Sequence, residues 1–106
     1  MKEPQKIDFA SLDWQDALPG ARFKAVQRSG RRLRLVELTR GFVEPDWCVK
    51  GHIGYVIAGQ MDVDFDGNVI RFSAGDGLFI SAGPKSRHKA SVLTDVAKLI
   101  LVEDAE

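Results

Sequence analysis

Alternating hydrophobic and polar positions predict that much of this chain is β-strand. In residues 32–38, leucine and valine largely alternate with arginine and glutamate, as on a strand with one dry and one solvated face. Ser29-Gly30, just before this stretch, predicts a turn that pairs it with residues 23–26. We therefore expect a hairpin with Leu33 and Leu35 on the buried face. The neighbouring arginines are expected to form a solvated strand face: Arg28, Arg31, Arg32 and Arg34.

A second hairpin is predicted around Asp66-Gly67. The residues on both sides, 61–65 and 68–72, have strand-type composition, and Asp-Gly suits the positive φ angles of a two-residue type I′ turn. Further short β-type runs are bounded by glycine, proline, aspartate or serine: 55–58, 77–80 and 97–102. No long helical period is present, so turns must join the strands and the strands must be antiparallel. The pattern predicts an all-β fold, either a barrel or a jelly roll.

The first twenty residues are predicted to be an arm that leads into the fold. Their short apolar steps are mixed with acids and end at Pro19-Gly20. We expect residues 1–20 to form this N-terminal arm and residues 21–106 to form a single β-barrel domain. A chain of 106 residues with 44% hydrophobic residues can supply one packed core and not two.

Charge and cysteine content narrow the class of protein. Fifteen Lys and Arg balance fifteen Asp and Glu, which excludes a basic nucleic-acid binder and a polybasic membrane-docking protein. No run approaches the roughly 18 apolar residues of a membrane helix. One cysteine cannot form an internal disulfide, and no signal-peptide pattern is present. We expect a cytoplasmic protein that binds neither nucleic acid nor membranes.

Histidine and cysteine, the residue types that most often bind transition metals, are scarce in this chain and lie in or beside segments that contain glycines. The only cysteine is Cys48, and the only histidines are His52 and His88. If the segment before residue 52 is extended, Asp46, Cys48, Lys50 and His52 project from one face. A thiolate, an imidazole and a carboxylate, joined by His88 from a later strand, would form a mixed site that suits Zn²⁺ or Fe²⁺. Each residue also has a structural alternative, such as a buried thiol or a turn-capping aspartate.

Two motifs resemble those of small single-domain cupins. Residues 52–59 match the second half of the first cupin motif, with His52 at the family's glutamate position. The family's spacing puts Asp46 and Cys48 at its two histidine positions. Residues 75–83 follow the second motif, with Ser81 in place of a proline and His88 two residues beyond the family's histidine. The resemblance implies a double-stranded β-helix, that is, a small RmlC-like jelly roll, and a homodimer.

The resemblance leaves the function open between classes. One expectation is a cupin that binds a small polar metabolite in its barrel and acts as a metal-dependent isomerase, lyase or dioxygenase. The other is a non-catalytic ligand-binding or sensing module without metal. The expected metal ligands are Cys48, His52, His88 and Asp46, for zinc or iron first and nickel or manganese next. The expected substrate-binding residues are Tyr55, Trp47, Phe79 and Lys50.

Overall fold

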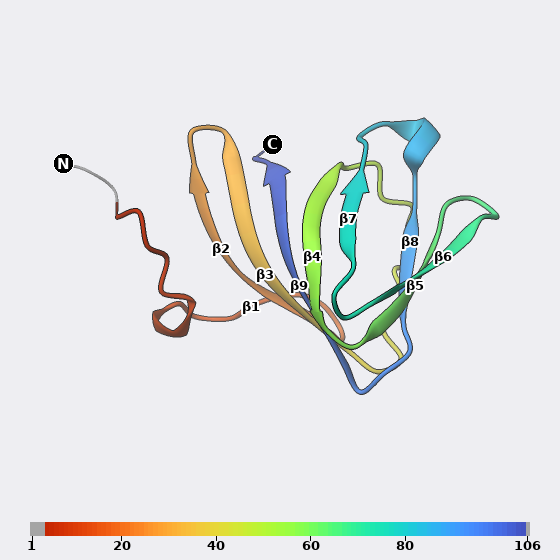
Figure 1. The fold of residues 1–106 in the computed structure, drawn as a ribbon, viewed down its shortest axis with the longest axis horizontal. Helices are drawn as coiled ribbons and strands as arrows, with labels where there is room; N and C mark the ends of the chain where they lie inside the picture. The colour runs from red at the N-terminus through yellow and green to blue at the C-terminus, as the bar shows by residue number, and fades with distance from the viewer. Residues whose placement is uncertain (1–3, 106) are drawn as a thin grey trace.

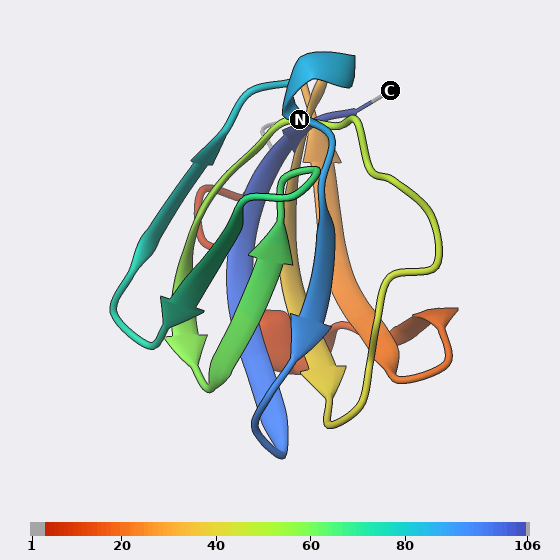
Figure 2. The same cartoon turned by 90° about the vertical axis from the view of Figure 1, so that its right-hand side faces the viewer.

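The chain folds into two antiparallel sheets that face each other. The structure is a computed structural model and describes residues 4–105. One sheet has six strands in the order β1-β2-β3-β9-β4-β7, and the other has three in the order β6-β5-β8. Figures 1 and 2 show the two sheets as opposed layers. The strands are β1 (Gln15–Leu18), β2 (Ala21–Arg28), β3 (Arg31–Thr39), β4 (His52–Ala58), β5 (Gln60–Asp64), β6 (Val69–Ser73), β7 (Gly77–Ile80), β8 (Lys89–Val92) and β9 (Val96–Asp104).

This arrangement confirms the predicted all-β jelly-roll class, and both predicted hairpins are present. Strand β2 pairs with β3 around Ser29-Gly30, where φ is 50° and 75°. Strand β5 pairs with β6 around Asp66-Gly67, where φ is 58° and 104°. Positive φ at both central residues is the geometry of a type I′ turn, whose twist matches that of the flanking strands. Short-range turn chemistry therefore sets the register of these two hairpins.

The hydrophobic core lies between the two sheets. Strand β9 shows how it is built, because Ala97, Leu99 and Leu101 are buried while the residues between them are partly exposed. Val56 of β4 and Val63 of β5 are almost fully buried. Each points from its own sheet toward the other sheet. Burial of this apolar surface is the main force that holds the two layers together.

The predicted N-terminal arm contains regular structure. A short 3-10 helix, η1, covers Phe9–Ser11, and β1 pairs with β2 at the edge of the six-stranded sheet. The Lys24 ammonium on β2 donates a hydrogen bond to the Phe9 carbonyl at 2.8 Å and lies over the Trp14 ring. The arm therefore packs against the outer face of β2. In Figure 1 it is the red segment to the left of β2. Residues 1–3 and 106 of the predicted arm and domain lie outside the described residues.

The prediction for the two faces of β3 was wrong. Arg32 and Arg34 share a face with the buried Val36 and Leu38, so they point between the sheets and not into solvent. The pairing with β9 gives the same result, because Arg34 lies opposite the buried Leu101. The leucines that alternate with these arginines belong to the outer face. The pattern misled because the strand carries apolar residues on both faces.

Candidate metal centre

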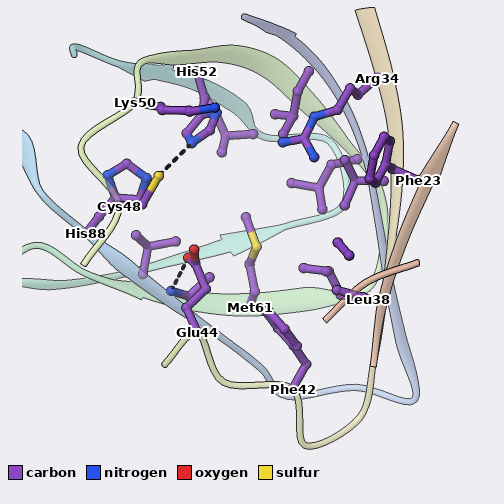
Figure 3. A pocket seen from close by; sticks show the side chains of 18 of the residues that line it. Phe23, Arg34, Leu38, Phe42, Glu44, Cys48, Lys50, His52, Met61 and His88 are labelled. Atoms are coloured by element: carbon purple, nitrogen blue, oxygen red, sulfur yellow. Dashed lines mark hydrogen bonds between the residues drawn. The ribbon is translucent and has the colours of Figure 1, made fainter. Parts of the chain in front are cut away.

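The fold brings Cys48 and His52, which are four residues apart, together with His88 from a distant part of the chain. Cys48 lies in the connection between β3 and β4, His52 is the first residue of β4, and His88 immediately precedes β8. Cys48 and His88 form an isolated antiparallel bridge, in which each backbone N–H donates to the other's carbonyl at 2.9 and 3.0 Å. This bridge ties the β3–β4 connection to the three-stranded sheet. His52 reaches the pair from the opposite sheet (Figure 3).

The three side chains present one ligand atom each within a small volume. The Cys48 sulfur lies 3.6 Å from His52 Nε2, and the three ligand atoms lie within 4.8 Å of one another. The two imidazole rings meet edge to face, with centroids 5.2 Å apart. His88 is 3% exposed, and the His52 side chain is 12% exposed. The cluster is therefore largely shielded from bulk water.

Hydrogen bonds orient both imidazoles with Nε2 toward the cluster. His88 Nδ1 donates to the Ser86 carbonyl at 2.9 Å, because a carbonyl can only accept. His52 Nδ1 lies 2.6 Å from a Glu103 carboxylate oxygen, which likewise accepts. Metal-binding histidines generally donate their other ring N–H to a carbonyl or carboxylate in this way, which fixes the tautomer and strengthens the ligand. Both imidazoles thus have the orientation that a metal ligand requires.

The separations suit a divalent transition metal. In a tetrahedral site with zinc at about 2.3 Å from sulfur and about 2.0 Å from nitrogen, those two atoms are about 3.5 Å apart. The distance between the Cys48 sulfur and His52 Nε2 is 3.6 Å. A set of one thiolate and two imidazoles suits zinc and iron. Three protein ligands leave a coordination position for water or a small molecule, as in catalytic zinc sites.

Glu103 is a functional residue that the sequence analysis missed. Its side chain is 1% exposed, and its carboxylate accepts two hydrogen bonds from Arg34, both at 2.7 Å, and one from Arg32 at 3.1 Å. Burial alone would raise the pKa of this carboxyl, but the hydrogen bonds from His52 and Arg34 hold the pKa far below its usual value. A signal was available: Glu103 continues the row of inward positions 97, 99 and 101 on β9, where an acid is unexpected.

Without metal, the geometry favours a charged pair. Burial would lower the pKa of His52, but the hydrogen bonds to Cys48 and Glu103 outweigh it and raise the pKa to about 9. The hydrogen bond from His52 lowers the pKa of the Cys48 thiol, against the opposing effect of burial. Thiolate is the form of cysteine that binds metals and acts as a nucleophile. The site therefore favours the reactive form of Cys48.

A cavity of about 250 Å³ lies between the sheets beside the cluster. Cys48, His52 and His88 line it, together with charged residues and core residues. In the view of Figure 3, Lys50, His52 and Arg34 lie along the upper part of the cavity, and Leu38 and Phe42 lie along the lower part. A largely apolar cavity with a few grouped polar side chains is the usual form of a small-molecule site.

Of the other predicted site residues, the structure places Lys50 at the cavity and the remaining four outside it. Lys50 lines the cavity, but Asp46 is exposed and lies outside the Cys-His-His cluster, because the segment before His52 is not a regular strand. Tyr55 and Phe79 lie on the outer face and are 49% and 82% exposed. Tyr55 is three residues from the inward-facing His52, so its side chain points to the opposite face, and Phe79 is paired with the outward-facing Ile53. Trp47 stacks against the Arg87 and Lys89 cations outside the cavity.

The raised pKa of His52 predicts a pH-dependent stability. The contribution of His52 is best measured in the Cys48→Ala variant. In the wild type, the lowered pKa of the Cys48 thiol makes a contribution to stability with the opposite pH dependence. In Cys48→Ala the Glu103 carboxylate still raises the pKa of His52 above 6.5, although by less than in the wild type because the contact with Cys48 is gone. The contribution of His52 to stability is therefore complete below pH 6.5 and is lost as pH rises from 6.5 toward 9. We expect the free energy of unfolding of Cys48→Ala to fall by about 1–3 kcal/mol across this range. Urea unfolding at several pH values measures it. A double variant that adds His52→Gln should lack this decrease, and an equal decrease in both would contradict the assignment.

Comparisons with known proteins support the cupin resemblance through structure. No protein-family model and no curated protein matches the chain. KdgF from Halomonas sp. is 27% identical, with a TM-score of 0.79 over 98% of this chain and 96% of that chain. An RmlC-like cupin from Shewanella frigidimarina is 18% identical, with a TM-score of 0.76 over 98% and 93%. The polyketide cyclase RemF from Streptomyces resistomycificus is 14% identical, with a TM-score of 0.82 over 98% and 81%.

The similar structures include a polyketide cyclase and a sugar phosphate isomerase, so the likeness shows a fold and not one reaction. Within residues 4–105, none of the helices has the length and apolar character needed to span a bilayer. Three observations indicate the same fold: the two opposed sheets, the two motif regions and the structural likeness over almost the whole chain. The chain therefore has the RmlC-like jelly-roll fold of small cupins.

Proposed function

We propose that this cupin holds one divalent metal ion, zinc or iron, through Cys48, His52 and His88, and binds a small polar metabolite in the adjoining cavity. One observation carries the proposal: the three ligand atoms lie within 4.8 Å of one another, with both imidazoles oriented by hydrogen bonds at Nδ1. A cluster that served only to pack the core would not need both ring orientations held in this way.

The surrounding residues divide the work of such a site. A bound metal would polarise a ligand oxygen as a Lewis acid or support redox chemistry. Glu103 holds the ring of His52, the Ser86 carbonyl holds the ring of His88, and the apolar side chains of the cavity exclude water. Isomerase, lyase and dioxygenase reactions all remain within this proposal, because each uses a small polar substrate beside a metal in a protected cavity.

A second candidate function uses the same residues without metal. The Cys48 sulfur faces His52 Nε2, and His52 Nδ1 is hydrogen-bonded to Glu103. A thiol, a base and an orienting carboxylate are therefore connected by successive contacts. This arrangement is typical of an activated cysteine nucleophile. If Cys48 is neither a ligand nor reactive, the third possibility is a non-catalytic binding or sensing module.

Elemental analysis of protein purified without chelators tests the proposal. We expect close to one zinc or iron per chain in the wild type, and less than a tenth of that in Cys48→Ala, because the variant lacks the thiolate ligand. Asp46→Asn is the matched control, since Asp46 lies outside the cluster and should not affect metal content. Wild-type protein that holds no metal and takes up none on reconstitution would overturn the proposal, and rapid alkylation of Cys48 would then favour the nucleophile.

The predicted homodimer stays a prediction. In its support, the outer face of the six-stranded sheet carries exposed apolar side chains on adjacent strands, including Ile53 and Tyr55 of β4 and Phe79 of β7. A second copy of the chain could cover this face.

A further inference from the structure

The cavity contains two arginines that share one carboxylate. Arg34 uses Nε and Nη2 to bind Glu103, and Arg32 binds the same carboxylate through Nη2 alone. Both side chains line the cavity and are largely buried, with exposed fractions of 25% and 18% for Arg32 and Arg34. Glu103 can neutralise only one of these two guanidinium groups. One positive charge inside the barrel is therefore left without a carboxylate of its own.

Arg32 also has an unused donor. Its Nε is buried and has no hydrogen-bond partner among residues 4–105, and it is the one such side-chain atom in that part of the chain. Buried donors in folded proteins are nearly always paired, because an unpaired one loses its hydration without compensation. The Nε atom itself is closed off from the cavity, but the Arg32 side chain is 25% exposed and lines the cavity, so an anion can bind the other donors of this guanidinium group.

The remaining charges of the cavity add to this positive excess. Arg22 also lines the cavity, but it is paired with Glu37 on the outer face at 2.8 Å. Apart from Arg22, the lining has three permanent cations, Arg32, Arg34 and Lys50, and one carboxylate, Glu44. Glu103, which binds the two arginines, adds a second carboxylate. One Glu44 oxygen is already engaged by the Ala90 amide at 2.8 Å. A bound divalent metal would increase the excess.

We propose that the ligand of this cavity is a small organic anion, whose carboxylate or phosphate group accepts hydrogen bonds from Arg32. Planar guanidinium groups bind both anions well through paired N–H donors. The volume of about 250 Å³ is below the usual lower limit of about 300 Å³ for ligand sites, which restricts the ligand to a small molecule. The inference deepens the proposed function and rests on it only in taking this cavity as the ligand site.

Titration calorimetry with simple anions tests the inference. The probes are malonate, inorganic phosphate and the uncharged malonamide, each added to metal-free and zinc-loaded protein. We expect malonate or phosphate to bind, and malonamide to bind at least tenfold more weakly. Arg32→Gln should weaken anion binding by about 10- to 100-fold, as for the loss of a charge-assisted hydrogen bond. Whether malonate or phosphate binds more tightly distinguishes a carboxylate ligand from a phosphate ligand.

Arg31→Gln is the matched control, because Arg31 is the preceding residue on β3 but is exposed, 4.0 Å from Asp104. It should bind the anions as the wild type does, and Arg32→Lys, which keeps the charge, should bind them better than Arg32→Gln. Anions that bind no better than malonamide would overturn the inference, and so would equal affinities in Arg31→Gln and Arg32→Gln. Zinc content, measured separately on each sample, reports on the proposed function, so the two can fail independently.

Discussion

Replacing Glu103 with alanine is expected to lower the free energy of unfolding by about 3–5 kcal/mol. The carboxylate is 1% exposed and binds Arg32, Arg34 and His52. Its removal leaves two buried guanidinium groups and an imidazole without their acceptor and opens a cavity between the sheets. Breaking a buried ion pair from one side is among the most destabilising single changes, because the remaining charges stay buried. Urea unfolding of metal-free protein at pH 7 measures the effect.

Glu37→Ala is the control for this prediction. Like Glu103, Glu37 lies on a strand of the six-stranded sheet and has two cationic partners, Arg22 and Lys98. Those partners are 46% and 37% exposed. Because solvent screens such pairs, we expect a loss of at most about 1 kcal/mol. Glu103→Gln keeps the volume and one acceptor oxygen, so it should fall between the two alanine variants. Similar losses for Glu103→Ala and Glu37→Ala would show that the buried cluster does not stabilise the fold in the way described.

Zinc should stabilise the metal-free wild type by about 4 kcal/mol when its free concentration is a thousand times its dissociation constant. The physical reason is linkage: the folded chain holds the ligand atoms of Cys48, His52 and His88 within 4.8 Å of one another, whereas the unfolded chain has no such preformed site. His88→Ala removes one of three ligands and should lose at least half of this stabilisation at the same zinc concentration. Urea unfolding with and without zinc measures both changes.

His88 is 3% exposed, so His88→Ala will itself be less stable than the wild type. For each protein we therefore compare the free energy of unfolding with zinc and without zinc. The lower stability of metal-free His88→Ala does not affect this difference. Asp46→Asn should show the full wild-type stabilisation. An equal response to zinc in His88→Ala and the wild type would mean that zinc binds elsewhere, and the metal centre would have to be abandoned.

Much of the fold could be predicted from local patterns. The turns at Ser29-Gly30 and Asp66-Gly67 depend on positive φ angles that only a few residue types adopt, so they are visible in the sequence. The motif around His52 placed it at the start of a strand inside a cupin barrel, where the structure has it. The structure also brings Cys48 and His88 to His52, while metal binding itself stays a prediction.

The inner face of β3 and the role of Glu103 could not be predicted in the same way. Alternation shows that Arg32 and Leu33 lie on opposite faces, but it does not say which face meets the second sheet. That choice depends on the pairing of β3 with β9, which joins Arg32 to Glu103 across 71 positions of the chain.

The sequence by itself determined most of the strands, the tight turns and the all-β class, because backbone preferences and hydrophobic period act over a few residues. The cupin type of barrel was implied by the resemblance of two motifs. Only the tertiary structure decided which polar groups meet inside the barrel. The contact between His52 and Glu103 spans 51 positions and depends on β4 and β9 pairing in one register. The cost of burying a charge is offset only by partners at hydrogen-bond distance, and such partners are a property of the folded chain.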